Sequence, residues 1–252
     1  MPVLGIIAAL HHEIASLLQA MGPDIKIHNI GQRAYHEGTL MGQPCVIVLS
    51  RVGKVAAAAT TVTLIREFKV NSILFTGLAG SINNDVKIGD VVVATQLLQY
   101  DLNAAPLFPR YQVPLLGKSH FDTDSKLTEQ LKSSVQGYLQ HDMNNDIHPQ
   151  VLDTFKLQQP QWHAGIIISG DCFVSNATHA SQLQQDLPDA LCVEMEGASV
   201  AQICHEYEVP FAIARVISDK ADGSAHTDFN AFLEQVARHY SAGILKRFLS
   251  LN

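Results

Sequence analysis

The stretch Val193-Glu194-Met195-Glu196-Gly197 is followed, about one helix and one strand later, by Arg215-Val216-Ile217-Ser218-Asp219-Lys220-Ala221-Asp222. Between them, apolar residues recur at helical spacing, and residues 211–217 form a nearly continuous apolar run of strand length. In an open α/β sheet, ligands bind in the crevice beyond the carboxyl ends of the strands. Ser218 and Asp219 are therefore expected in such a crevice. From these residues alone, the alternative is that they cap the next helix.

The same alternation of strand and helix patterns extends over the whole sequence. Strands are expected at residues 3–8, 44–49, 72–75, 90–94, 165–168, 191–193 and 211–217. Helices are expected at residues 11–21, 53–68, 124–139, 177–185, 195–207 and 228–248. This order predicts a single α/β domain over residues 1–252, with a mixed central β-sheet flanked by helices. Residues 140–162 are polar with little periodicity, so we expect an irregular excursion from the core there.

Composition narrows the classes of function. A chain of 252 residues with 47% hydrophobic content can bury the core of one full domain. Its 17 basic and 24 acidic residues give a net charge of -7 without a basic cluster, which argues against nucleic acid as a partner. The apolar start is too short to span a bilayer and lacks the basic flank of a signal peptide, so it predicts a buried strand and no membrane partner. Four cysteines in apolar segments, without metal-ligand spacing, fit buried thiols in a reducing, cytoplasmic compartment.

Small and polar residues follow several expected strands. Residues 50–55 and 76–81 contain glycines that permit tight turns or a close approach of backbone amides to a ligand. Neither segment has the spacing of a Walker loop or of a dinucleotide fingerprint, and no cofactor is expected. The first strand leads into His11-His12-Glu13. Side chains of neighbouring residues on a helix point in different directions, so a metal site at these residues is disfavoured. Glu13 is either a solvated residue of a first helical turn or a general acid or base in the crevice.

Seven blocks, in order, carry a resemblance to a known family. They are Gly5-Ile6-Ile7 with Glu13, residues 50–57, Thr76-Gly77-Leu78-Ala79-Gly80, residues 88–92, Ser169-Gly170-Asp171-Cys172-Phe173-Val174, residues 193–196 and residues 215–222. The chain resembles the 5'-methylthioadenosine/S-adenosylhomocysteine nucleosidases of the nucleoside phosphorylase superfamily. The match covers nearly the whole chain apart from residues 103–121 and 140–162.

The resemblance implies hydrolysis of the N-glycosidic bond between adenine and a 5'-thio-substituted ribose. It implies that Asp219 protonates or hydrogen-bonds adenine N7 and that Ser218 orients its carboxylate. Glu13 would activate the attacking water, and Arg215 would help to hold that water and the Glu13 carboxylate. This agrees with the chemistry, because an oxocarbenium-like transition state needs a proton donor at the leaving group and a base for water.

The resemblance also implies which residues bind the substrate. Glu196 would accept hydrogen bonds from the ribose 2' and 3' hydroxyls, with Met195 against the sugar. Phe173 would stack on adenine while the Val174 backbone reads its edge. The positions that match the lining of the alkylthio pocket are Leu10, Val52 and Phe229. Leu78 is a departure, since the nucleosidases usually carry serine there to help fix the water.

Three alternatives stay open. A purine nucleoside phosphorylase would use phosphate as the nucleophile, but the stretch 74–80 offers no arginine, and Leu78 stands at the hydroxyl position, so hydrolysis is favoured. A nucleosidase for another 5'-substituted purine nucleoside, such as the futalosine type with a 5' aryl-keto group, fits the same reaction class. A noncatalytic nucleoside-binding protein on this scaffold is disfavoured by the intact Glu13 and Asp219.

Residues 103–121 are rich in proline and aromatic side chains. Aromatic residues of this kind are enriched at interfaces. In the resembling family, a loop of the dimer partner closes the alkylthio pocket. The resemblance thus predicts a homodimer in which this segment has that role.

Overall fold

The computed structural model describes residues 2–8, 11–222 and 225–251, except for the side chains of residues 11–13 and 225–228. Ten strands lie in this part of the chain, in one mixed sheet. They are β1 (Leu4–Ala8), β2 (Lys26–Ile30), β3 (Arg33–Leu40), β4 (Gln43–Leu49), β5 (Ser72–Ser81), β6 (Val91–Gln99), β7 (His120–Asp122), β8 (Trp162–Ser169), β9 (Ala190–Glu194) and β10 (Phe211–Asp219).

Part of the sheet closes on itself. Strand β10 pairs with β5 in parallel and with β6 in antiparallel orientation. The ring is completed by β8 and β9, because β8 pairs with both β6 and β9, and β9 pairs with the end of β5. Strands β1, β4, β3 and β2 extend the sheet from the first half of β5.

The long strand β5 changes neighbours along one edge, and this change positions the site. Its pairing with β1 ends at Phe75, and its pairing with β9 begins at Gly80. Residues 76–79 therefore lie where the sheet divides, while β10 continues along the other edge. A division of this kind leaves space beyond the strand ends, which is where ligands bind in α/β folds.

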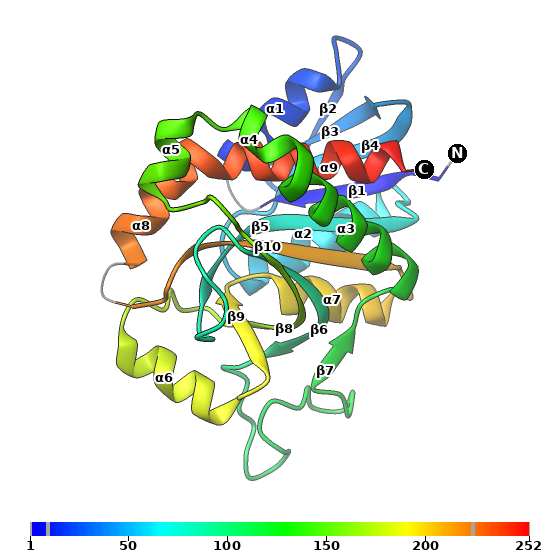
Figure 1. The fold of residues 1–252 in the computed structure, drawn as a ribbon. Coiled ribbons are helices and arrows are strands. Elements are labelled where there is room, and N and C mark those ends of the chain that lie inside the picture. The colour runs from blue at the N-terminus through cyan, green and yellow to red at the C-terminus, as the bar shows by residue number, and fades with distance from the viewer. Residues whose placement is uncertain (1, 9–10, 223–224, 252) are drawn as a thin grey trace.

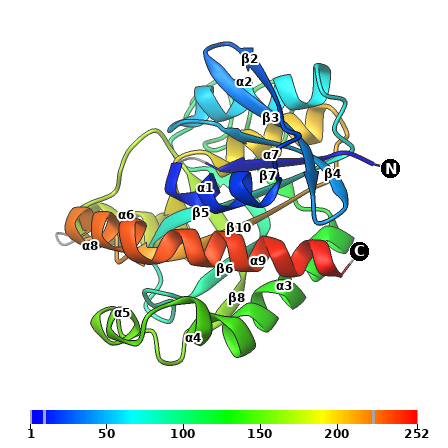
Figure 2. The same ribbon diagram turned by 90° about the horizontal axis from the view of Figure 1, so that it is seen from above.

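Helices cover both faces of the sheet (Figures 1 and 2). On one face, α1 (His11–Ala20) and α3 (Ser125–Gly137) pack against α9 (Arg238–Ser250), and on the other α2 (Lys54–Arg66) packs against α7 (Gly197–Glu206). The remaining helices are α4 (Met143–Asp146), α5 (Pro149–Thr154), α6 (Ala177–Asp186) and α8 (Ala225–Phe232). π-Helical turns at Tyr138–Asp142 and Leu233–Ala237 join α3 to α4 and α8 to α9. None of the described helices is long and apolar enough to cross a membrane.

The structure confirms the predicted fold class and adds elements that the sequence pattern did not indicate. The hairpin β2–β3 falls in a region where no strand was expected, because most of its side chains are polar and only two of them are fully buried. Residues 140–162 differ from the expected irregular excursion. They form α4, α5 and the start of β8, and they bury Met143, Ile147 and Leu157 against the core under α9.

The contact between α9 and the first π-helical turn leaves no room for a side chain at Gly243. A Cβ atom there would lie 2.1 Å from Cε2 of the buried Tyr138 ring. We expect Gly243→Ala to lower the free energy of unfolding by about 1–3 kcal/mol through overpacking, although alanine favours a helix by about 1 kcal/mol over glycine. Urea unfolding measures the change. In the control Gly137→Ala, the three atoms nearest to the new methyl group all belong to the partly exposed Arg247 side chain, which can shift more easily than a buried ring, and a smaller loss is expected. Unchanged stability of Gly243→Ala would contradict this close packing.

Candidate active site

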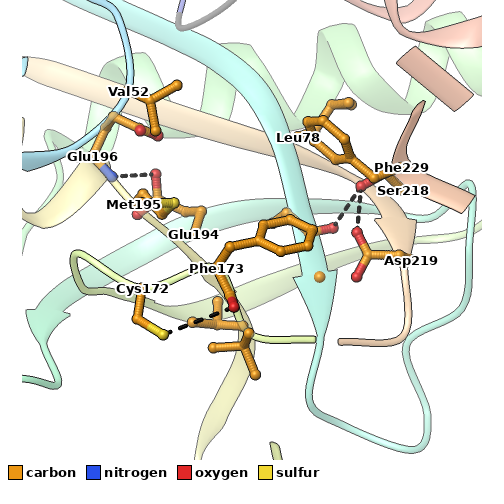
Figure 3. Close-up of a pocket in the computed structure, with 14 residues that line it drawn as sticks. Val52, Leu78, Cys172, Phe173, Glu194, Met195, Glu196, Ser218, Asp219 and Phe229 are labelled. Atoms are coloured by element: carbon orange, nitrogen blue, oxygen red, sulfur yellow. Dashed lines mark hydrogen bonds between the residues drawn. The ribbon is translucent and has the colours of Figure 1, made fainter. Parts of the chain in front are cut away.

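A cavity of about 360 Å³ opens where the sheet divides (Figure 3). Its lining comes from β5, the loop after β8, the end of β9, the end of β10, the loop before α2, and α8. The described residues that line it are Val52, Leu78, Ala79, Gly80, Cys172, Phe173, Val174, Val193, Glu194, Met195, Glu196, Ser218, Asp219 and Phe229. Apolar side chains predominate, and the charged groups in this set are three carboxylates, Glu194, Glu196 and Asp219.

Asp219 ends β10 and is held in one orientation. The Ser218 hydroxyl donates to Asp219 Oδ2 over 2.8 Å, and the Ala221 backbone N–H donates to Oδ1 over 2.8 Å. The residue is only 2% exposed. Gly80 of β5 provides the space, because a Cβ atom at that position would lie 2.8 Å from Asp219 Oδ1. A buried carboxyl group with a fixed orientation is thus presented at the cavity.

Arg215 and Glu194 form an ion pair inside the protein. The Arg215 guanidinium donates to Glu194 Oε2 from Nη2 over 2.8 Å and from Nε over 3.2 Å. Both side chains are almost completely shielded, with exposed fractions of 1% and 2%. The guanidinium carbon also lies 3.9 Å from the centroid of the Phe75 ring, a cation–π distance. Arg215 itself is not among the lining residues and reaches the cavity through Glu194.

The Glu194 carboxylate also organises the start of α7. It accepts hydrogen bonds from the backbone N–H groups of Glu196 and Gly197 and from the Ser169 hydroxyl. Ser169 in turn accepts from the Ala198 N–H over 2.7 Å. These donors satisfy orphan amides of a helix N-terminus, where a negative charge is favoured. The sequence analysis assigned Glu196 but did not assign Glu194. The sequence gives only part of the signal, since an arginine within an apolar strand requires a buried counter-charge but does not indicate which carboxylate supplies it.

Glu196 follows Met195 between the end of β9 and the start of α7, and it is 5% exposed. Its Oε1 accepts a hydrogen bond of 2.8 Å from the Gly53 backbone N–H, just before α2. Gly53 has a φ of 98°, a conformation that favours glycine and turns this N–H toward the carboxylate. The carboxylates of Glu194 and Glu196, the two neighbours of Met195 in the sequence, therefore bind the N-termini of α7 and α2 next to the cavity.

The apolar wall consists of side chains from four separate segments (Figure 3). The Phe173 and Phe229 rings meet edge to face with centroids 5.7 Å apart. Val52 is half exposed at the mouth, and Leu78 lies on β5. Cys172 is an exposed thiol at this wall, contrary to the expectation that the cysteines are buried, which holds for the other three. Val174, the residue after Phe173, is buried and also lines the cavity.

The structure brings together most of the residues that the sequence singled out. Asp219, Ser218, Glu196, Met195, Phe173, Val174, Leu78, Val52 and Phe229 all line the cavity. Leu10 and the side chain of Glu13 lie outside the described residues. Arg215 contacts Glu194, while its expected contact with Glu13 stays a prediction. No group of three metal-ligating side chains occurs in the described part of the chain.

Comparison with known proteins places this arrangement in a family. The phosphorylase superfamily model matches residues 3–250. A 5'-methylthioadenosine/S-adenosylhomocysteine nucleosidase of Staphylococcus carnosus is 32% identical over 99% of this chain and 100% of its own length. An aminodeoxyfutalosine nucleosidase of Helicobacter pylori is 34% identical over 98% of this chain and 97% of its own.

A solved structure gives the same assignment. The crystal structure of the 5'-methylthioadenosine/S-adenosylhomocysteine nucleosidase from Neisseria meningitidis, in complex with methylthio-immucillin-A, matches with a TM-score of 0.86 and 31% identity. The match covers 100% of both chains. The chain therefore belongs to the phosphorylase superfamily, and within it to the nucleosidases, enzymes that hydrolyse N-glycosyl bonds.

Proposed function

We propose that this enzyme hydrolyses the N-glycosidic bond of 5'-methylthioadenosine and S-adenosylhomocysteine, releasing adenine and a 5'-thioribose. The observation that carries the proposal is the position of two buried carboxyl groups, Asp219 and Glu196, at one largely apolar cavity with the Phe173 ring in its wall. An apolar cavity with a few fixed polar groups suits a nucleoside, whose base is flat and whose sugar carries hydroxyls. The relatives named above act on nucleosides of this type.

Asp219 is the general acid of the proposed mechanism. As the C–N bond breaks, negative charge accumulates on adenine, and a proton or hydrogen bond at N7 stabilises the leaving base. Ser218 keeps the carboxyl group oriented through its 2.8 Å hydrogen bond. Glu13 activates water on the other side of the sugar, and Arg215 assists it.

The remaining residues bind the substrate. Glu196 accepts hydrogen bonds from the ribose hydroxyls, and Met195 lies against the sugar. Phe173 stacks on adenine, and the Val174 backbone reads the edge of the base. The 5' substituent occupies the apolar region that Val52, Phe229 and Leu10 provide. No cofactor or metal has a role in this chemistry.

Water is favoured over phosphate as the nucleophile. Among the described residues that line the cavity, none is Lys or Arg, and the nearby Arg215 is neutralised by Glu194. A phosphate dianion at such a lining would lose its hydration without gaining a cation, which is strongly unfavourable. A water molecule does not meet this penalty.

A second substrate class is supported by two observations. The aminodeoxyfutalosine nucleosidase is as similar to this chain as the 5'-methylthioadenosine/S-adenosylhomocysteine nucleosidase is. Leu78 adds an apolar side chain to the cavity at the position where the resembling nucleosidases usually carry serine, and a larger apolar area favours a substrate with an apolar group such as an aryl ring. A futalosine-type nucleoside is therefore the alternative substrate of the same reaction.

Adenine release tests the proposal directly. We expect the purified enzyme to release adenine and free methylthioribose from methylthioadenosine, at the same rate with and without phosphate. Chromatography identifies both products, and aminodeoxyfutalosine is assayed in parallel. A requirement for phosphate, with formation of a sugar 1-phosphate, would make the enzyme a phosphorylase. Release from aminodeoxyfutalosine alone would replace the proposed substrate with the alternative.

The role of Asp219 predicts a separation of turnover from binding. Asp219→Asn removes the proton donor but keeps the shape and the contact with Ser218. We expect kcat to fall by a factor of about 10²–10⁴, the usual contribution of a general acid, while ligand affinity stays near that of the wild type. The matched control is Asp222→Asn, three residues on, which is expected to retain activity. Unchanged turnover in Asp219→Asn would remove this residue from the mechanism.

The proposed homodimer predicts that activity depends on association. Leu107 and Leu115, in the segment 103–121 that we propose to close the partner's alkylthio pocket, are 84% and 94% exposed. Leu107→Glu together with Leu115→Glu should weaken association and raise KM, because the 5' substituent loses apolar cover. Sedimentation measures the oligomeric state alongside the assay. A fully active wild-type monomer would rule out the dimer.

A further inference from the structure

Three residues from separate segments form a closed ring of hydrogen bonds next to the cavity. Lys54 Nζ lies 2.5 Å from Asp101 Oδ1, and the other Asp101 oxygen accepts from the Asp171 backbone N–H over 2.9 Å. Asp171 Oδ1 completes the ring by accepting from the Lys54 backbone N–H over 2.8 Å. Each member of the ring thus contacts both of the others.

The ring joins three parts of the fold that are far apart in the sequence. Lys54 begins α2, Asp101 follows β6, and Asp171 lies in the loop after β8. Lys54 Nζ donates a further hydrogen bond of 3.1 Å to Gln99 Oε1 at the end of β6. The Lys54 side chain is 15% exposed and that of Asp101 is 32% exposed, so the pair is partly shielded from water. Partial shielding and shared donors make such a pair stronger than an isolated surface ion pair.

The loop that the ring holds is the one that forms the cavity wall. Cys172, Phe173 and Val174 follow Asp171 directly and line the cavity. The preceding Gly170 N–H donates to the Glu194 carbonyl over 3.1 Å, which fixes the loop at its start. The Asp171 N–H, two residues before Phe173, therefore holds the loop through its hydrogen bond to the charged side chain of Asp101.

The same helix terminus also holds the other side of the cavity. The Gly53 N–H, one residue before Lys54, donates to Glu196 Oε1 over 2.8 Å. A displacement of Lys54 would therefore move both the Phe173 wall and the Glu196 carboxylate. The glycine in residues 50–55 predicted a tight turn or a close approach of backbone amides to a ligand, and the structure shows two of these amides bonded to protein carboxylates.

We infer that Lys54 is a positioning residue for substrate binding. It acts by holding the loop 171–174 and the Glu196 carboxylate in fixed positions on two sides of the cavity. It touches neither the cavity nor the proposed reacting atoms, since it is not a lining residue. Its effect is on the binding of the base and sugar as a whole. Because ground state and transition state use the same wall, its loss raises KM and leaves kcat nearly unchanged. This inference rests on the proposed function for its kinetic readout alone.

The test uses the full-length enzyme with Lys54→Met, which keeps most of the side-chain stem but removes the charge. We expect KM for methylthioadenosine to rise about fivefold with kcat within about twofold, the upper range for a partly exposed ion pair. Hydrogen exchange of the backbone amides in residues 170–174, followed by mass spectrometry, should become about fivefold faster in the absence of substrate. Lys54→Arg keeps the charge and should restore part of both effects. Asp101→Asn breaks the ring at a second member and should reproduce both changes.

Lys132→Met is the matched control. It removes an ion pair of 2.7 Å with Glu129 on α3, and the Lys132 side chain is 20% exposed, close to the value for Lys54. This variant should leave KM and the exchange of residues 170–174 unchanged. If Lys54→Met and Asp101→Asn behave like Lys132→Met in both measurements, the inference is overturned. If the wild-type enzyme releases no adenine, the proposed function fails, and the exchange measurement alone decides the role of Lys54.

Discussion

The ion pair between Arg215 and Glu194 is the interaction on which the rest of the site depends. Two opposite charges with exposed fractions of 1% and 2% are stable only if each satisfies the other, because an unpaired buried charge is strongly destabilising. Glu194 meets this requirement with three donors besides Arg215, which are the Glu196 and Gly197 backbone N–H groups at the start of α7 and the Ser169 hydroxyl. The pair therefore fixes the end of β9, the start of α7 and the middle of β10 relative to one another.

The active site follows from that arrangement. Strand β10 places Asp219 four residues beyond Arg215, and the turn after β9 places Glu196 two residues beyond Glu194. Both proposed functional carboxyl groups thus extend from a rigid, charged anchor. The division of the sheet at β5 leaves the cavity between them, and the loop carrying Phe173 closes its remaining side. Positioning of this kind on strand ends gives a site the rigidity that catalysis needs.

The local sequence signals predicted the fold class and a crevice at Ser218 and Asp219, while most of the other cavity residues were implied by the family resemblance. Apolar runs that end in Ser218 and Asp219 show where a strand stops and polarity begins. The pairing of Glu194 with Arg215 could not be assigned in this way, since it joins residues of two strands that are not neighbours in the sheet. The ring at Lys54 was equally inaccessible, because its three members are brought together only by the tertiary fold. Residues 140–162 carry their buried side chains too sparsely for the helical period to be seen.

A double-mutant cycle on this pair tests the central claim most directly. The variants are Glu194→Gln, Arg215→Gln and the double variant, and the free energy of unfolding is measured in urea for all four proteins. Each single substitution is expected to lower it by about 3–5 kcal/mol, because the partner is left buried and unpaired. The double variant should then lose clearly less than the two single losses together, by at least about 1 kcal/mol. Additive losses, or single variants as stable as the wild type, would contradict the account.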